Sequence, residues 1–204
     1  MRFFNYILFM LFCFLAGCIQ KELTPAQYMT WVKSEEHGLR IGKQIGNCSF
    51  TLQYKPCEYE ALLHHKNEIK NELDLNKSTA PLKNLQYFTL TIKNADGKEI
   101  MEEGSFEMVE YGSKLNYMIS DMQMDFSLID GNDTVPCAFY HYERNFGVSP
   151  ENNILLGFES SATDKNKVND KTLIYEDKLL GNGIVMLTIK SEDIKQVPRL
   201  KFVK

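Results

Sequence analysis

The chain has 204 residues, of which 44% are hydrophobic and 25% are charged, and its formal net charge at pH 7 is −4. A chain of this length suits one domain with a sizeable core. The net negative charge argues against a nucleic-acid partner and against electrostatic attachment to a membrane surface, because both need clusters of Lys and Arg.

The first seventeen residues are predicted to be a signal peptide. Arg2 supplies a basic start, and a nearly uninterrupted apolar run follows over residues 6–16. This run is too short for a membrane-spanning helix, which needs roughly 20 apolar residues. It ends at the small residues Ala16 and Gly17, which are typical of a cleavage site. We therefore expect residues 1–17 to be removed.

A four-residue motif at the end of this run reads L-A-G-C: Leu15, Ala16, Gly17 and Cys18. It resembles the lipobox of bacterial lipoproteins, in which the cysteine thiol takes a diacylglycerol group before cleavage. The resemblance implies three fatty acyl chains on Cys18 and effectively permanent attachment, since stable anchoring needs two or more chains. The alternative is an ordinary secretory signal that happens to be cleaved near a cysteine.

Residues 18–23 are expected to form a short lipid-anchored tether. At about 3.3 to 3.6 Å per residue, the segment after Cys18 reaches less than roughly 20 Å, which keeps the domain close to the bilayer. Position 19 is Ile and not the Asp of inner-membrane lipoproteins, so the resemblance implies the outer membrane. The charged stretch 20–22 is similar to some surface-export signals, and it leaves open whether the domain faces the periplasm or the outside.

Three cysteines remain in the mature chain after Cys13 is removed and Cys18 is lipidated: Cys48, Cys57 and Cys137. In an oxidising envelope, one pair can form a disulfide in any of three combinations and leave one thiol over. The alternative is three buried free thiols that pack as small apolar residues. The sequence leaves both arrangements open.

A capping box predicts where the first helix begins. Thr24 is followed by Pro25 at the first helical position and by Gln27, an order typical of a helix N-terminus. Gly38 is expected to end the helix. Three residues at helical spacing form its apolar face: Tyr28, Trp31 and Val32.

The pattern then changes to a strand and back to a helix. Alternating apolar and polar residues predict a half-buried strand over 48–54. Its inward residues are Cys48, Phe50, Leu52 and Tyr54. A second helix is predicted over 58–75, because residues recur there at spacings of three and four. That stripe consists of Tyr59, Leu62, Lys66, Ile69 and Leu73.

From Leu85 onward, the sequence predicts mostly strands and turns. One strand covers 88–92, and residues 94–97 are typical of a hairpin turn. A short helix is predicted over 113–120, and another turn over 130–133. Alternation around that second turn predicts that eight side chains point inward: Met122, Met124, Phe126, Leu128, Val135, Cys137, Phe139 and His141.

Three later strands are predicted over 154–159, 172–176 and 184–190, and a polar loop over 163–170. Short strands joined by hairpin turns favour an antiparallel sheet. We therefore expect one β-rich domain over 24–204. Its class is α+β, with a mainly antiparallel sheet arranged as a sandwich or a meander and with two early helices.

Three stretches resemble a family of small uncharacterised lipoproteins from Gram-negative bacteria. The longest covers residues 136–147 and reads P-C-A-F-Y-H-Y-E-R-N-F-G, and the others are residues 153–159 and 197–202. With residues 52–59, they span most of the mature chain. The resemblance implies an envelope location and a common fold, and it implies no activity.

The candidate metal ligands are Glu60, His64 and Glu68, which are spaced at four on one predicted helix face. These side chains carry atoms that Zn²⁺ accepts. The adjacent His65 points about 100° away from His64, so the two histidines cannot hold one ion together. A solvated polar face explains the same spacing, and we expect no metal and no cofactor.

A second cluster, His141, Glu143 and Arg144, lies on or just after a predicted strand. The expected role of His141 is that of a hydrogen-bonded core residue on the face of Cys137. A nucleophile and base pair between these two residues is disfavoured, because positions four apart on a strand lie about 13 Å from one another.

The function that these patterns favour is that of a membrane-anchored envelope lipoprotein, a non-catalytic component for binding or assembly. The lipobox and the lack of a recognisable catalytic motif support this expectation. The partner would be an envelope protein or glycan of unspecified identity. The alternative is a hydrolase or metal-dependent enzyme that acts on envelope or host polymers, and only the scattered histidines and carboxylates suggest it.

Overall fold

The computed structural model of the chain describes residues 21–100, 108–160 and 168–202. The predicted signal peptide, the lipobox with Cys18 and most of the loop predicted over 163–170 lie outside these residues. Among the residues that are described, no helix is both long and apolar enough to cross a membrane.

Eight strands form one antiparallel sheet in the order β2-β3-β4-β7-β6-β5-β8-β9. Their bounds are Arg40–Ile45 (β2), Cys48–Lys55 (β3), Leu85–Asn94 (β4), Phe126–Asp130 (β5), Asp133–Glu143 (β6), Glu151–Glu159 (β7), Lys171–Asp177 (β8) and Gly183–Ile189 (β9). The sheet is strongly curved, and its two edge strands, β2 and β9, contact each other. The predicted α+β class with a mainly antiparallel sheet is confirmed.

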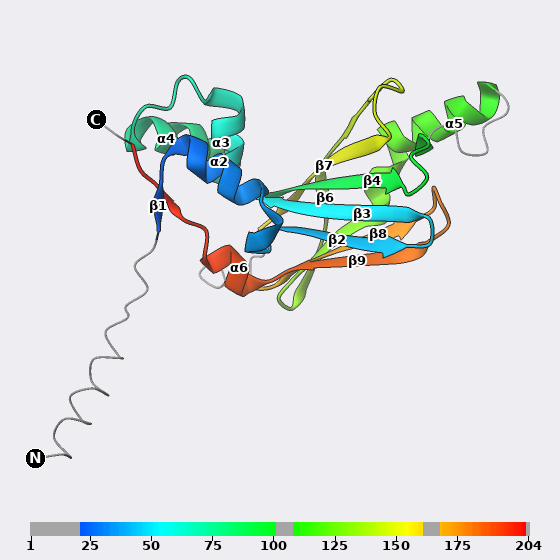
Figure 1. The fold of residues 1–204 in the computed structure, drawn as a ribbon. Helices are drawn as coiled ribbons and strands as arrows, with labels where there is room; N and C mark the ends of the chain where they lie inside the picture. The colour runs from blue at the N-terminus through cyan, green and yellow to red at the C-terminus, as the bar shows by residue number, and fades with distance from the viewer. Residues whose placement is uncertain (1–20, 101–107, 161–167, 203–204) are drawn as a thin grey trace, which may run out of the picture.

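The helices α2, α3 and α4 gather at one end of the sheet, together with a parallel pair of short strands, β1 and β10 (Figure 1). We call this the helical end, and α5 lies at the opposite end. The bounds are Glu22–Leu23 (β1), Pro25–Lys33 (α2), Cys57–His65 (α3), Glu72–Thr79 (α4), Met108–Ile119 (α5), Ser191–Lys195 (α6) and Arg199–Leu200 (β10). Short 3-10 helices cover Glu35–His37, Ala80–Leu82 and Asp121–Asp125.

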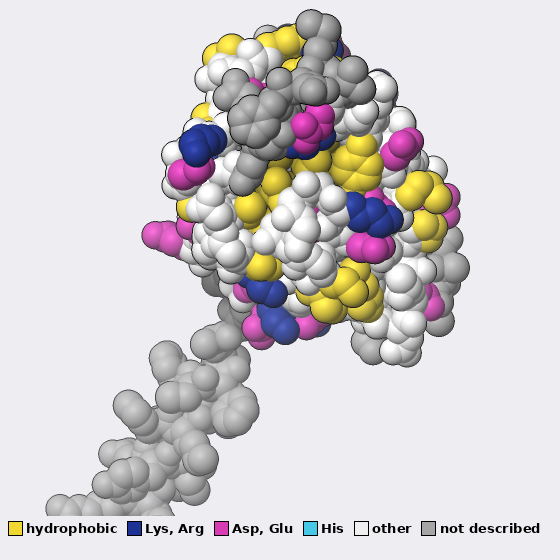
Figure 2. All heavy atoms as spheres, turned by 90° about the vertical axis from the view of Figure 1, so that its right-hand side faces the viewer, with side chains coloured by type: hydrophobic (Ala, Val, Ile, Leu, Met, Phe, Trp, Pro, Cys, Tyr) yellow, Lys and Arg dark blue, Asp and Glu magenta, His cyan; other side chains and the backbone are white. Residues whose placement is uncertain are grey.

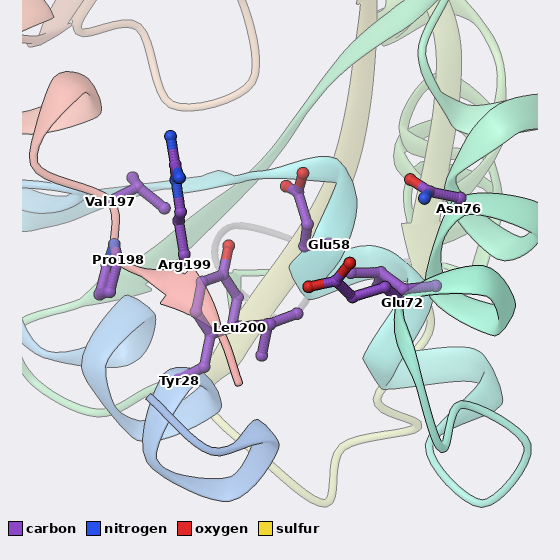
Figure 3. A pocket seen from close by; sticks show the side chains of 9 residues that line it. Tyr28, Glu58, Glu72, Asn76, Val197, Pro198, Arg199 and Leu200 are labelled. Atoms are coloured by element: carbon purple, nitrogen blue, oxygen red, sulfur yellow. The ribbon is translucent and has the colours of Figure 1, made fainter. Parts of the chain in front are cut away.

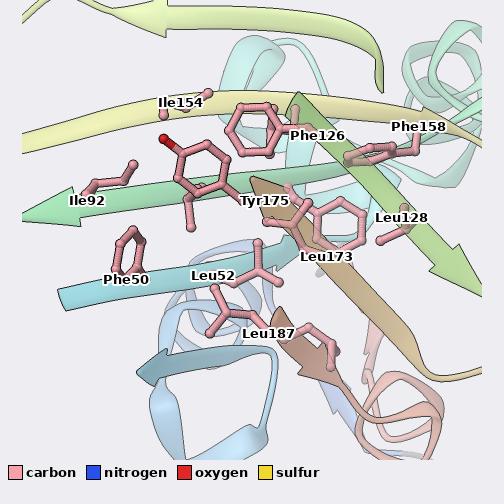
Figure 4. Close-up of a cluster of buried hydrophobic side chains, with 14 of the residues drawn as sticks. Phe50, Leu52, Ile92, Phe126, Leu128, Ile154, Phe158, Leu173, Tyr175 and Leu187 are labelled. Atoms are coloured by element: carbon pink, nitrogen blue, oxygen red, sulfur yellow. The ribbon is translucent and has the colours of Figure 1, made fainter. Parts of the chain in front are cut away.

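The core lies inside the curve of the sheet (Figure 4). Alternate residues of β4 point into it, so that Phe88, Leu90 and Ile92 are buried. From the facing strands β5 and β8, Phe126 and Tyr175 stack with their ring centroids 4.7 Å apart. Each large apolar side chain that is buried in this way contributes about 1.5 to 3 kcal/mol, which stabilises the curvature.

The predicted capping box begins α2. The backbone N–H of Gln27 donates to the Thr24 side chain, and the Gln27 side chain accepts from the backbone N–H of Thr24. The predicted apolar face is buried: Tyr28, Trp31 and Val32. The α-helix ends at Lys33, and a 3-10 turn leads on to Gly38, whose φ of 69° is left-handed.

The single helix predicted over 58–75 is wrong, because the chain forms α3 and α4 there. Asn71 caps α4, and its side chain accepts a hydrogen bond of 3.0 Å from the backbone N–H of Asp74. Asn favours such a cap over the interior of a helix. Ile69, between the two helices, is buried, whereas Leu73 in the first turn of α4 is 63% exposed, so the predicted stripe does not continue into α4.

An irregularity in β6 overturns the predicted inward face of this strand. The register with β7 shifts between Cys137 and Phe139, and such a bulge exchanges the two faces of the residues that follow. Phe139 and His141 are therefore exposed, contrary to the prediction, and Tyr142 is buried instead. Opposite the bulge, a Cβ atom added to Gly157 would lie 2.9 Å from the Cβ of Phe139.

Two further predictions are corrected, and one strand is added. Met124 is 86% exposed, because it lies in a 3-10 helix and not in an alternating strand. Gly97 adopts the φ of 75° expected of a turn, but residues 98–100 form no strand, so the turn closes no hairpin in the described chain. The edge strand β2 was not predicted, because its exposed Lys43 and Gln44 interrupt the apolar alternation.

Candidate binding site at the helical end

A cavity of about 350 Å³ lies at the helical end, between α2, α3, α4 and the segment that contains β10. This volume is within the range of small-ligand sites. Its apolar wall consists of Leu75, Val197, Pro198 and Leu200. Its polar side chains are Tyr28, Glu58, Glu72, Asn76 and Arg199 (Figure 3). We call this the β10 cavity.

Local structure places each of the charged side chains. Glu58 lies in the first turn of α3 and Glu72 in the first turn of α4, where a helix dipole stabilises negative charge. Arg199 belongs to β10, which is held beside the start of the described chain: the backbone N–H of Arg199 donates to the carbonyl oxygen of Lys21 at 3.0 Å. The three side chains thus come from three separate elements.

The hydroxyl of Tyr28 is the most unusual group of the cavity. The residue is 1% exposed, and its hydroxyl has no hydrogen-bond partner among the described residues. Figure 3 shows this hydroxyl directed between Arg199 and Glu58. Burial, and then the negative charge of Glu58, raise the pKa of Tyr28 far above its ordinary value, so the hydroxyl keeps its proton. A buried polar group without a partner costs about 1 to 3 kcal/mol.

The charged side chains that line the cavity make no ion pair in the described chain, and two of them, Glu72 and Arg199, are exposed to solvent. Within the described chain, Glu58, Glu72 and Arg199 form no ion pair within 4.0 Å. Two carboxylates and one guanidinium give the lining a formal charge of −1. The arrangement suits a small ligand that carries both a cationic and an anionic group.

A second hollow at the helical end has different chemistry. It is more open, with a volume of about 580 Å³, and it lies beside Trp31 and His37. Their rings stack with centroids 4.1 Å apart, so they occupy each other's faces. At the opposite end of the molecule, hydrophobic side chains lie in separate groups among polar and charged ones (Figure 2). We therefore regard the β10 cavity as the candidate site.

The structure does not bring the three candidate metal ligands together. Glu60 is buried and pairs with Lys55 at 3.1 Å and with His64 at 3.4 Å. Because α3 ends before it, Glu68 pairs with His65 instead, at 3.4 Å. No group of three or more His, Cys, Asp or Glu side chains among the described residues is placed to hold a metal ion.

The second candidate cluster does not converge either. His141, Glu143 and Arg144 are all exposed, and the bulge in β6 turns His141 away from the core. The guanidinium of Arg144 lies 4.7 Å from the ring centroid of Phe146, so it is used in a cation–π contact. These residues lie on the exposed surface of the described chain.

The three cysteines of the described chain form no disulfide with one another. Cys48 donates to the Asn94 side chain at 3.4 Å. Burial raises the pKa of Cys57 and of Cys137 to about 11. At neutral pH these two thiols are protonated and therefore poor nucleophiles.

Sequence reasoning missed the β10 cavity, although it found parts of its wall. The capping box of α2 predicts that Tyr28 is buried, but not that its hydroxyl lacks a partner. Arg199 lies in the stretch 197–202, one of those that carry the resemblance to a lipoprotein family. That stretch was the available signal, since nothing local indicates that β10 packs beside α2, α3 and α4.

No family model matches the chain, and no curated protein matches it. A crystal structure of a protein of unknown function from Burkholderia pseudomallei matches with a TM-score of 0.39 and 13% sequence identity. The match covers 86% of this chain and 94% of that chain. A likeness of this size does not establish a shared fold or function.

Proposed function

We propose that this protein is an envelope lipoprotein, anchored in the outer membrane by fatty acyl chains on Cys18, and that its folded part binds a ligand or partner without catalysing a reaction. The observation that carries the anchoring is the L-A-G-C motif at the end of a short apolar run. Ile19, in place of Asp, favours the outer membrane.

The start of the folded part supports a position close to the bilayer. Glu22 in β1 comes four residues after Cys18, a span of about 14 Å at most. Because β1 pairs with β10, the β10 cavity lies at the end of the domain that the anchor would hold nearest to the membrane.

The chemistry of the β10 cavity supports binding. Its polar groups are two carboxylates, an amide, a guanidinium and a protonated phenol, and such groups fix the orientation of a ligand. The described thiols are hydrogen-bonded and the histidines lie elsewhere on the surface. A role in recognition or assembly therefore fits these residues best.

The test of anchoring is the intact mass of the protein extracted from membranes. We expect a mature N-terminus at Cys18 that carries the mass of a diacylglyceryl group and an amide-linked acyl chain, and we expect the protein to sediment with outer membranes. Cys18→Ser should abolish both properties, and Cys13→Ser is the matched control that should retain them. An unmodified N-terminal peptide from native membranes would overturn the proposal.

A further inference from the structure

We propose that the β10 cavity binds a phosphoethanolamine group, with Arg199 contacting the phosphodiester and with Glu58 and Glu72 contacting the primary ammonium. The inference deepens the proposed binding role and rests on it for the source of the ligand. The chemical part rests on the cavity alone, which combines unpaired charges of both signs with a buried hydroxyl that has no partner.

The acidic side of the cavity fits a primary ammonium. Such a group has three N–H donors and no acceptor, so it needs several oxygen atoms around it. Glu58, Glu72 and the side-chain oxygen of Asn76 line the same cavity and supply them. A quaternary ammonium has no N–H to donate and is recognised by aromatic cages, which this lining lacks among its described residues.

The basic side of the cavity fits a phosphodiester. Guanidinium groups bind phosphate oxygens through paired, charge-assisted hydrogen bonds. The Tyr28 hydroxyl, directed between Arg199 and Glu58 in Figure 3, keeps its proton and has no acceptor in the described chain. Because the hydroxyl oxygen is fully enclosed, a ligand oxygen reaches it only when the neighbouring side chains move apart. A phosphodiester carries one negative charge, so a single Arg suffices, and the ammonium offsets the charge of one of the two carboxylates.

The position of the cavity favours a lipid headgroup as the source of this group. Arg199 of β10 lies opposite Glu22 of β1 in the register of the two parallel strands, and neighbouring strands lie about 4.8 Å apart. With the span of about 14 Å from Cys18 to Glu22, Arg199 would lie within about 20 Å of the anchored cysteine. A soluble or glycan-linked phosphoethanolamine has the same chemistry and is the other source.

The first experiment measures binding of the soluble probe glycerophosphoethanolamine. The full chain, purified in a detergent that contains no phospholipid, is titrated with the probe in a calorimeter. We expect saturable binding, with glycerophosphocholine and glycerol phosphate at least tenfold weaker. Equal binding of the three compounds, or no binding of the first, would overturn the inference.

Substitutions then assign the two sides of the cavity. We expect each of three substitutions to weaken binding of the probe at least tenfold: Arg199→Gln, Glu58→Gln and Glu72→Gln. The matched controls Arg144→Gln and Glu143→Gln remove the same charges from the exposed part of the surface around β6 and should leave the dissociation constant unchanged. Because Arg199 belongs to β10, circular dichroism checks its fold, and the exposed Glu72 gives an independent answer if β10 is disturbed. Unchanged binding in Glu72→Gln and Glu58→Gln would contradict the assignment.

The second experiment distinguishes the two sources. The protein is placed in lipid nanodiscs of phosphatidylcholine alone or with added phosphatidylethanolamine, and the soluble probe is titrated into each. Loss of probe binding only in the discs with phosphatidylethanolamine shows that the headgroup occupies the cavity. Equal binding in both kinds of disc assigns the cavity to a soluble or glycan-linked phosphoethanolamine.

Failure of this inference and failure of the anchoring proposal give different results. If Cys18 is lipidated but the probe does not bind, the phosphoethanolamine inference fails and the anchoring proposal stands. Probe binding by a protein whose N-terminus proves unmodified removes the anchor and leaves the ligand class.

Discussion

Two buried polar groups, one in the curved sheet and one at the helical end, differ in their hydrogen bonding. In the curved sheet, the Asp130 carboxylate accepts hydrogen bonds from Lys171 at 2.5 Å, Gln86 at 2.9 Å and Asn169 at 3.3 Å. At the helical end, the equally buried Tyr28 hydroxyl has no partner in the described chain. The first group is satisfied within the fold, whereas the second has no hydrogen-bond partner in the described chain.

The contrast is not simply one of incomplete bonding. The side-chain oxygen of Gln86 also lacks a partner, but its amide nitrogen is bonded to Asp130, so the side chain is fixed. Tyr28 and Thr89 of β4 each have a single polar side-chain atom, and both atoms lack a partner in the described chain, but of these two residues it is Tyr28 that lines the β10 cavity. A buried group without a partner is therefore informative chiefly where its surroundings have room for a ligand.

Truncation of Asp130 is expected to have the largest effect on stability. Asp130→Ala leaves the ammonium of Lys171 buried without its anion, and loss of one partner of a buried pair costs about 3 to 5 kcal/mol. Chemical denaturation gives the change in the free energy of unfolding. Lys93→Ala, which breaks the exposed pair with Glu151 at 3.9 Å, is the control and should cost less than about 1 kcal/mol. Similar losses in both variants would break the comparison.

Acidification should reduce the stability that the hydrogen bonds of Asp130 contribute. Burial alone raises the pKa of Asp130, but hydrogen bonds from Lys171, Gln86 and Asn169, together with the charge of Lys171, outweigh it and hold the pKa below its ordinary value. Because the folded-state pKa is the lower one, the stabilisation is complete above the unfolded pKa of about 3.9 and is lost as the pH falls through the folded pKa.

Unfolding free energies measured from pH 6 to pH 2 check this expectation. The native protein should lose stability more steeply below about pH 4 than Asp130→Asn, whose amide does not titrate. Parallel curves for the two proteins would show that Asp130 contributes nothing to the acid response.

Removal of a hydroxyl from each of two buried tyrosines gives a smaller and sharper contrast. Tyr175 donates to the Asp177 carboxylate at 3.0 Å, so Tyr175→Phe should cost about 1.5 to 3 kcal/mol. Tyr28→Phe removes a group without a partner, and we expect no loss of stability but weaker binding of glycerophosphoethanolamine. Equal destabilisation by the two substitutions would show that Tyr28 has a partner after all.

The last prediction concerns the alkylation rates of two cysteine thiols, for which we expect the smallest effect. With pKa values near 11, Cys57 and Cys137 should resist iodoacetamide at pH 7.5 in the folded protein and react in denaturant. Peptide masses after timed alkylation give the two rates. Alkylation at the same rate in both states would mean that these side chains are accessible and ionised.

Local patterns predicted much of the fold, and the failures have identifiable causes. The Thr24 capping box and the alternation in β4 act within a few residues, so the sequence was sufficient for both. The bulge after Cys137 shifts the alternation of β6 by one residue, and every later residue of the strand then faces the other side. The cap at Asn71 starts a new helix, so the apolar spacing of α3 does not continue into α4. The bulge turned His141 from a predicted core residue into an exposed one.

The candidate site depends on long-range contacts, which explains why sequence reasoning missed it. Tyr28 and Arg199 are separated by most of the chain, and their proximity follows from the pairing of β1 with β10. The candidate metal ligands depended on one continuous helix face, and α3 ends at His65, so Glu68 leaves the face of Glu60 and His64. The candidate cluster of β6 depended on the strand's register, which the bulge after Cys137 changes.

The pairing of β1 with β10 also determines how a pull on the N-terminal segment would be transmitted. The load would pass first to the hydrogen bonds that join Lys21 to Arg199 at 3.0 Å and Leu23 to Lys201 at 2.8 Å. The load would also reach α2, which follows β1 directly along the chain. The two-residue pairing of β1 with β10 is thus among the first contacts that such a pull would load. Loss of these hydrogen bonds would release the segment that carries Arg199 from β1.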